Sequence, residues 1–159
     1  MRRLSCSLLA TLLVSALHAL PVAAQTPAAA KACVLTPEQL AKTLGGSFQA
    51  GKEEGDQGAL GNACTYKGKD YTVWVIQTKP AQFGMTTQQL LKLTEPGQFK
   101  PLAGDPDGLQ FHQPKEGVPP FPSIVYERKG VVVKVRIVGP TPEPVDAMNA
   151  KLVKLPRLP

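Results

Sequence analysis

A phrase that occurs twice constrains this chain more than any other feature of its sequence. LTPEQLAK, at residues 35–42, is followed fifty residues later by MTTQQLLK, at residues 85–92. Each phrase places an apolar residue before a threonine, Thr36 or Thr86, and a glutamine three residues after it. This spacing is typical of a capping box with a hydrophobic staple, which satisfies the free amides at a helix start. The sequence therefore predicts two helices that begin in the same way.

A hairpin pattern follows each predicted helix. Residues 65–66 and 71–76 are rich in β-branched and aromatic side chains and flank a Lys-Gly-Lys-Asp turn. Residues 124–126 and 131–138 form a second such pair around an Arg-Lys-Gly turn. Two units of helix plus hairpin, packed side by side, would join the hairpins into one antiparallel sheet covered by helices. We therefore expect an α+β fold of two layers with tandem repeat units.

The expected domain spans residues 33–159, with related halves at about 33–80 and 81–159. Further strands are predicted at 47–53 and 109–113, and a last helix at 145–155. The apolar side chains expected in the core are Leu40 and Leu44 of the first helix, Leu90, Leu91 and Leu93 of the second, Val145, Met148, Leu152 and Leu155 of the last, and Trp74.

Residues 1–24 have the three parts of a secretory signal peptide: two arginines, an apolar stretch, and the small residues Val22-Ala23-Ala24. Cleavage after Ala24 would leave residues 25–32 as a disordered lead-in. An uncleaved anchor is the alternative, but the apolar stretch is short and contains three serines and a histidine. We therefore expect a periplasmic or secreted protein without membrane insertion after cleavage.

Charge and cysteine content agree with export. Removing residues 1–24, which hold two arginines and no acid, lowers the formal net charge from +6 to +4. A mildly basic chain favours anionic surfaces such as envelope glycan or an acidic protein, and scattered lysines give no reason to expect nucleic acid. Once Cys6 is removed, Cys33 and Cys64 form an even pair, which predicts a disulfide. A metal or redox pair is the alternative, but the close C-x-x-C spacing is absent.

Two stretches carry a resemblance. CVLTPEQLAKTLGG followed by CTYKGKDYTVWV resembles a class of small exported bacterial domains of unknown function, and the likeness covers most of Cys33 to Leu155. Many members of that class are lipoproteins, whereas this chain lacks the anchoring cysteine. QFGMTTQQLLKL, at residues 82–93, is similar to helix starts of β-lactamase inhibitory protein and of SmpA/OmlA-type outer-membrane assembly lipoproteins.

The second resemblance implies a fold and an alternative function. β-Lactamase inhibitory protein is a tandem α+β repeat that binds its enzyme through a concave sheet. A similar chain would be a hydrolase inhibitor. Its repeats carry cysteine pairs, whereas the half of this chain that contains Phe83 has none.

Residues that could carry catalysis are few after residue 24. The histidine is His112, and the serines are Ser47 and Ser123. Nucleophilic catalysis needs a nucleophile, a base and an orienting group that converge in space. GDPDG, at residues 104–108, fits a turn better than a calcium loop, which needs more oxygen ligands. We expect no enzyme activity, no cofactor and no metal site.

Aromatic and basic side chains on the two hairpins and on the Pro-rich loop at 114–122 suggest binding. The predicted binding surface consists of Tyr66, Tyr126, Phe121, Lys134 and Arg136, with a core position for one of the tyrosines as the alternative. We expect a non-catalytic binding protein for an unknown protein or envelope glycan, with hydrolase inhibition as the alternative. Tyrosines and cations together on one exposed sheet face would favour this function. Convergence of His112 with Ser123 or an acid would instead favour an enzyme.

Overall fold

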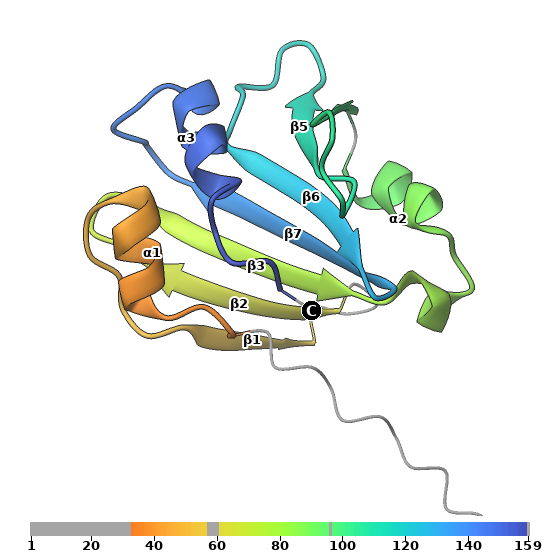
Figure 1. The fold of residues 1–159 in the computed structure, drawn as a ribbon, viewed down its shortest axis with the longest axis horizontal. Helices are drawn as coiled ribbons and strands as arrows, with labels where there is room; N and C mark the ends of the chain where they lie inside the picture. Colours follow the sequence, from red (N-terminus) through yellow and green to blue (C-terminus); the bar gives the residue numbers. More distant parts are fainter. Residues whose placement is uncertain (1–32, 57–60, 96, 159) are drawn as a thin grey trace, which may run out of the picture.

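The computed structural model describes residues 33–56, 61–95 and 97–158. The predicted signal peptide (1–24) and lead-in (25–32) lie outside these ranges. Within them the fold is α+β: seven strands form one antiparallel sheet, accompanied by three α-helices and a short 3₁₀ helix (Figure 1). No helix in the described ranges has the length and apolar content needed to cross a membrane.

The two predicted hairpins join side by side in the centre of the sheet. β3 pairs with β7, with Trp74 opposite Arg136, and the strand order is β1-β2-β3-β7-β6-β5-β4. The predicted hairpins and single antiparallel sheet are confirmed. The strands are β1 (Lys52–Asp56), β2 (Asn62–Lys67), β3 (Thr72–Thr78), β4 (Gly97–Pro101), β5 (Gln110–Pro114), β6 (Ser123–Arg128) and β7 (Val131–Val138).

Both repeated phrases form capped helices, as predicted. The Thr36 hydroxyl accepts a hydrogen bond from the Gln39 amide at 3.3 Å, and the Gln39 side chain accepts one from the Thr36 amide at 2.8 Å. Thr86 and Gln89 repeat this arrangement at 3.2 and 2.8 Å. The helices are α1 (Pro37–Leu44), α2 (Thr87–Thr94) and α3 (Val145–Leu152), and the 3₁₀ helix η2 is Pro80–Phe83.

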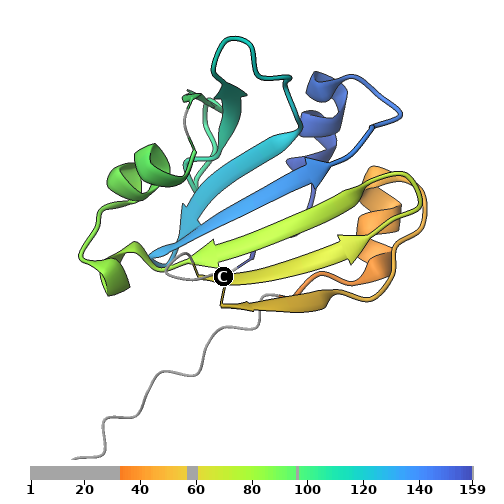
Figure 2. The ribbon, with the colours of Figure 1, turned by 180° about the vertical axis from the view of Figure 1, so that it is seen from behind.

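One face of the sheet is covered by α1 and α3. They lie in front of the strands in Figure 1 and behind them in Figure 2. Leu40 and Leu44 of α1 and Met148 and Leu152 of α3 are at most 1% exposed. They pack with alternate residues of the four central strands to form the main core. The sheet contributes Tyr66, Val73, Val75, Ile124, Tyr126, Val133, Val135 and Ile137. We call the face of the sheet that α1 and α3 cover the helix-covered face.

Helix α2 packs against the opposite face of the sheet. Leu90 and Leu91 form a small separate cluster with Val125 of β6 and Val132 of β7, whose neighbours along each strand point into the main core. Leu93 is 65% exposed, so its predicted burial is wrong, because it lies on the solvent side of α2. The two repeated phrases therefore place their helices on opposite faces. The tandem repeat is not confirmed.

A disulfide joins Cys33 to Cys64, with 5.1 Å between their Cα atoms. It attaches the segment before α1 to β2, and the Cys64 side chain is fully buried in the main core. The predicted pairing is confirmed.

The strands at and next to the sheet edges differ from the prediction. Of the predicted 47–53 strand, Phe48 forms an isolated bridge to Gly68, and Lys52 and Glu53 begin β1, which continues to Asp56. β5 lies one residue beyond the predicted 109–113. β4 was not predicted, because its sequence, GQFKP, contains glycine, lysine and proline, which are unfavourable in strands. It forms as an edge strand paired with β5, where proline is tolerated.

Candidate functional site

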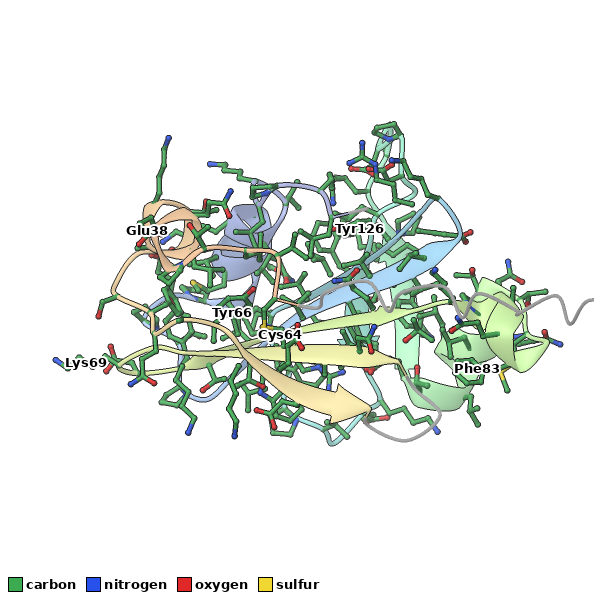
Figure 3. The ribbon with its side chains drawn as sticks, turned by 90° about the horizontal axis from the view of Figure 1, so that it is seen from below. Glu38, Cys64, Tyr66, Lys69, Phe83 and Tyr126 are labelled. Carbon is green, nitrogen blue, oxygen red and sulfur yellow. A yellow bond between two sulfur atoms is a disulfide. The ribbon has the colours of Figure 1, made fainter. Side chains whose placement is uncertain are left out.

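The structure does not bring the predicted binding residues together on one exposed surface. Tyr66 is fully buried and Tyr126 is 3% exposed. Figure 3 shows both on the side of the sheet that α1 and α3 cover. Strand alternation places them there, because Cys64, Tyr66, Ile124 and Tyr126 all point into the main core. Their inclusion in a binding surface is wrong.

Each buried tyrosine holds a distant segment of the chain instead. The Tyr66 hydroxyl accepts a hydrogen bond from the Leu35 amide at 3.0 Å, just before α1. The Tyr126 hydroxyl accepts one from the Leu158 amide at 2.8 Å, after α3. Burial raises the pKa of both tyrosines above the ordinary value of 10.0. Their roles are structural.

Lys134 and Arg136 lie on the other face of the sheet and share one carboxylate. The Lys134 ammonium and the Arg136 guanidinium each donate to Glu95, which directly follows α2. Glu95 is 5% exposed, so the charges meet in a largely dehydrated place. Glu95 is not among the residues predicted from the sequence. Two cations in the middle of a central strand were the signal for it, because buried charges require partners.

Phe121 belongs to the same group of residues. Its ring stacks on His112 with 5.3 Å between centroids, and the Arg136 guanidinium carbon lies 4.4 Å from the centre of the Phe121 ring. The Phe121 ring is half-buried and turned toward the sheet, where it meets these two side chains. Phe121, Lys134 and Arg136 therefore do converge, around Glu95 and His112. We call these five residues the Glu95 cluster.

The arrangement that would favour an enzyme is partly present. His112 Nε2 lies 3.9 Å from a Glu95 carboxylate oxygen, and Ser123 lies on the neighbouring strand, opposite Arg136. His112 and Glu95 are each 5% exposed and Ser123 is fully buried. None of these three side chains lines the groove described next. The fold thus brings an acid and a base together at a place that is nearly fully buried and outside that groove.

A groove of about 520 Å³ lies on the face of the sheet opposite the main core. Alternate residues of β2, β3 and β7 form its floor, including Trp74, Ile76 and Val132. Leu90 and Leu91 of α2 form a wall at one end. Trp74 is 42% exposed, so its predicted core position is wrong. It lies on the side of β3 that α1 and α3 do not cover.

The two ends of the groove differ in polarity. The end at α2 is apolar, where Leu90, Leu91 and Val132 meet. The other end, at the β2–β3 turn, carries the exposed Lys67 and the 41%-exposed Val138. In Figure 3, Lys69 marks the turn end and Phe83 the α2 end, and they lie at opposite ends of the sheet. Thr72 and Thr78 of β3 both line the floor, which makes it about 20 Å long.

The described part of the chain contains no group of three or more side chains suited to hold a metal ion. The GDPDG stretch is a turn, as expected. Asp105 accepts hydrogen bonds from the amides of Asp107 and Leu109 at 3.0 and 3.1 Å, and its carboxylate also pairs with Arg157.

Comparison of the chain with family models, curated proteins and solved structures finds no match. The class of protein is therefore defined by the fold and the site alone. It is a disulfide-linked α+β protein with an apolar groove on the face of its sheet that α1 and α3 leave open. A groove of this size, apolar with a few polar groups, is typical of small-ligand sites.

Proposed function

We propose that this chain is an exported, non-catalytic binding protein whose ligand is a cell-envelope component held in the groove. The observation that carries the proposal is the groove itself: about 520 Å³, mainly apolar, and open to solvent along Trp74 and Val138. Exposed apolar surface of this kind is unfavourable in water, and covering it with a ligand provides the driving force for binding.

The position of the Glu95 cluster supports binding rather than catalysis. Glu95 and His112 are nearly fully buried and lie outside the groove lining. A ligand on the groove floor would contact apolar side chains and Lys134, whose ammonium forms an ion pair with Glu95. Pairing of this kind fixes the position of Lys134 in the lining without providing a free nucleophile or base.

Export is part of the proposal. The Cys33–Cys64 disulfide suits an oxidising compartment, the periplasm or the extracellular space. We also propose that the halves at about 33–80 and 81–159 arose from one duplicated unit. In support, each half supplies a central hairpin whose first strand carries a buried tyrosine, Tyr66 or Tyr126.

The test is capture from envelope extract with two matched variants. Trp74→Ala removes an exposed apolar side chain from the groove floor, and Leu93→Ala removes one from α2 outside the groove. Protein and lipid ligands retained by each immobilised variant are identified by mass spectrometry. We expect a saturable ligand that the Leu93→Ala variant retains and the Trp74→Ala variant loses. Equal retention by both variants would contradict groove binding.

Hydrolase inhibition is the second candidate. The observation that favours it is an open sheet face bearing an exposed tryptophan, since tryptophan is enriched at the energetic centres of protein interfaces. This candidate follows from the resemblance to β-lactamase inhibitory protein. It predicts that the captured ligand is a hydrolase whose activity falls as the chain is added. A captured protein without such activity would rule it out.

A further inference from the structure

We infer that the groove takes an anionic amphiphile, namely a free long-chain carboxylic acid. Its apolar chain would lie on the floor under α2 and its carboxylate would meet Lys67. This inference rests on the proposed function, because it names the chemistry of the ligand in the same groove.

The dimensions of the floor suit one extended acyl chain. Its length from Thr78 to Thr72 is about 20 Å. One leaflet of a bilayer core, which a single acyl chain spans, is about 15 Å thick, half of the full core. A chain of that length leaves room for a small head group. The apolar end belongs at α2, where Leu90, Leu91 and Val132 close the groove.

Charge complementarity places the carboxylate at the other end. Lys67 is exposed, lines the groove and has no ion-pair partner among the residues that the structure describes. Lys134, the other described cation in the lining, lies two residues from Val132 toward the α2 end, and its ammonium is paired with Glu95. The unpaired cation at the Lys67 end favours an anion there over a neutral or cationic head group.

The acidic side chain among the described residues of the lining lies away from that end. Glu54 is on β1, whose register places it next to Ala63 rather than Lys67. Ala63 and Lys67 are four residues apart on β2, a separation of about 13 Å. A carboxylate at Lys67 is therefore separated from Glu54 by more than one Debye length at physiological salt, about 8 Å. The reverse orientation would bury the carboxylate among Leu90, Leu91 and Val132, where a charged group is unfavourable.

The test compares palmitate with cetyl alcohol, which has the same chain and a neutral head. Binding to the mature chain is followed below the micelle concentrations by fluorescence of Trp74, the single tryptophan, and by calorimetry. Lys67→Glu reverses the charge at the groove end. Lys154→Glu makes the same change at an exposed lysine after α3, outside the groove lining, and is the matched control. Circular dichroism establishes that both variants are folded.

We expect palmitate to bind about tenfold more tightly than the alcohol, the scale of one ion pair in a partly dehydrated site. Lys67→Glu should abolish that preference and Lys154→Glu should keep it. Equal binding of acid and alcohol, or a preference that Lys67→Glu leaves intact, would overturn the inference while groove binding stands. Binding of neither amphiphile would also overturn it, and the Trp74→Ala capture then decides the proposed function separately.

Discussion

Tyr66 and Tyr126 show how single residues join distant segments of this chain. Each lies on the first strand of a central hairpin, and each accepts a hydrogen bond from a backbone amide more than thirty residues away. Arg157, next to the segment that Tyr126 holds, places its guanidinium carbon 4.8 Å from the Tyr126 ring centre. These contacts hold the chain before α1 and after α3 against the sheet.

Tyr126→Phe should change how stability depends on pH. The pKa of Tyr126 is raised by burial, so in alkali the unfolded chain ionises this group while the folded chain keeps it neutral. Its contribution to stability is complete below about pH 10 and is lost as pH rises through the folded pKa. We expect the variant to lose about 1 kcal/mol at neutral pH, through the missing acceptor for Leu158, and to lose less stability in alkali than the wild type.

Urea unfolding at neutral pH and at about pH 10.5 measures both effects. Tyr66→Phe should behave in the same direction, because the cause of its raised pKa is also burial. If Tyr126→Phe loses as much stability between neutral pH and about pH 10.5 as the wild type does, ionisation of this tyrosine does not contribute to the loss.

Glu95→Gln should lower the free energy of unfolding, because Glu95 is a nearly buried carboxylate. The substitution leaves Lys134 and Arg136 close together without the negative charge that both contact. Because both cations are partly exposed, we expect a loss of about 2 kcal/mol, below the range for fully buried pairs. Thermal or urea unfolding measures it, with Glu116→Gln in the exposed Pro-rich loop as the control. A loss of unfolding free energy no larger than that of the control would mean that the negative charge of Glu95 does not stabilise the domain.

At the scale of elements, α1 and α2 combine the same cap with different packing. α1 buries Leu40 and Leu44 in the main core, and the carbonyls of Leu44 and Gly45 at its end accept hydrogen bonds from the Tyr71 hydroxyl. α2 buries Leu90 and Leu91 in a small cluster and otherwise faces solvent or the groove. Elements with little buried contact open locally at lower free energy than the whole domain.

Removal of the two caps should therefore have different consequences. Thr36→Ala should lower the free energy of global unfolding by about 1 kcal/mol. Thr86→Ala should instead speed amide exchange within α2 about fivefold, because the same loss, about 1 kcal/mol, lowers the free energy of local opening of this helix. The free energy of global unfolding should change little. Hydrogen exchange by NMR, together with urea unfolding, measures both quantities. Equal global losses in the two variants would show that α2 unfolds only with the rest of the domain.

At the scale of the whole molecule, the sheet separates the helix-covered face, which is structural, from the face with the groove, which is the candidate binding face. The disulfide belongs to the structural face, since the Cys64 side chain is buried in the main core. Stability and ligand binding can therefore be altered independently. The loop that the disulfide closes, with a sequence separation of 31, contributes about 4 kcal/mol in the chain-entropy estimate.

Replacing both cysteines by alanine tests this separation. We expect the free energy of unfolding in urea to fall by about 4 kcal/mol, while ligand affinity measured on the remaining folded protein stays within about twofold. Trp74→Ala should give the reverse result, with weak binding and near-normal stability. A cysteine variant that is stable but no longer binds its ligand would mean that the two faces are coupled.

The sequence by itself determined the local elements of this protein. Two capping boxes, two hairpins and an even cysteine pair are short-range or compositional signals, and each forms as predicted. Alternation along β7 likewise puts Lys134 and Arg136 on the face opposite the buried Val133 and Val135, because side chains on a strand point to opposite faces in turn.

Only the tertiary structure decided which face each element would cover. Alternation defines two faces but does not say which of them helices will bury, so Tyr66 was expected outside and Trp74 inside. Packing of α1 and α3 on one face buried the tyrosines, and placement of α2 on the other left Trp74 on an open groove floor. The Glu95 cluster joins residues from α2's end, β5, β7 and a loop. Such long-range contacts arise from the balance of burial over the whole domain, which no local pattern contains.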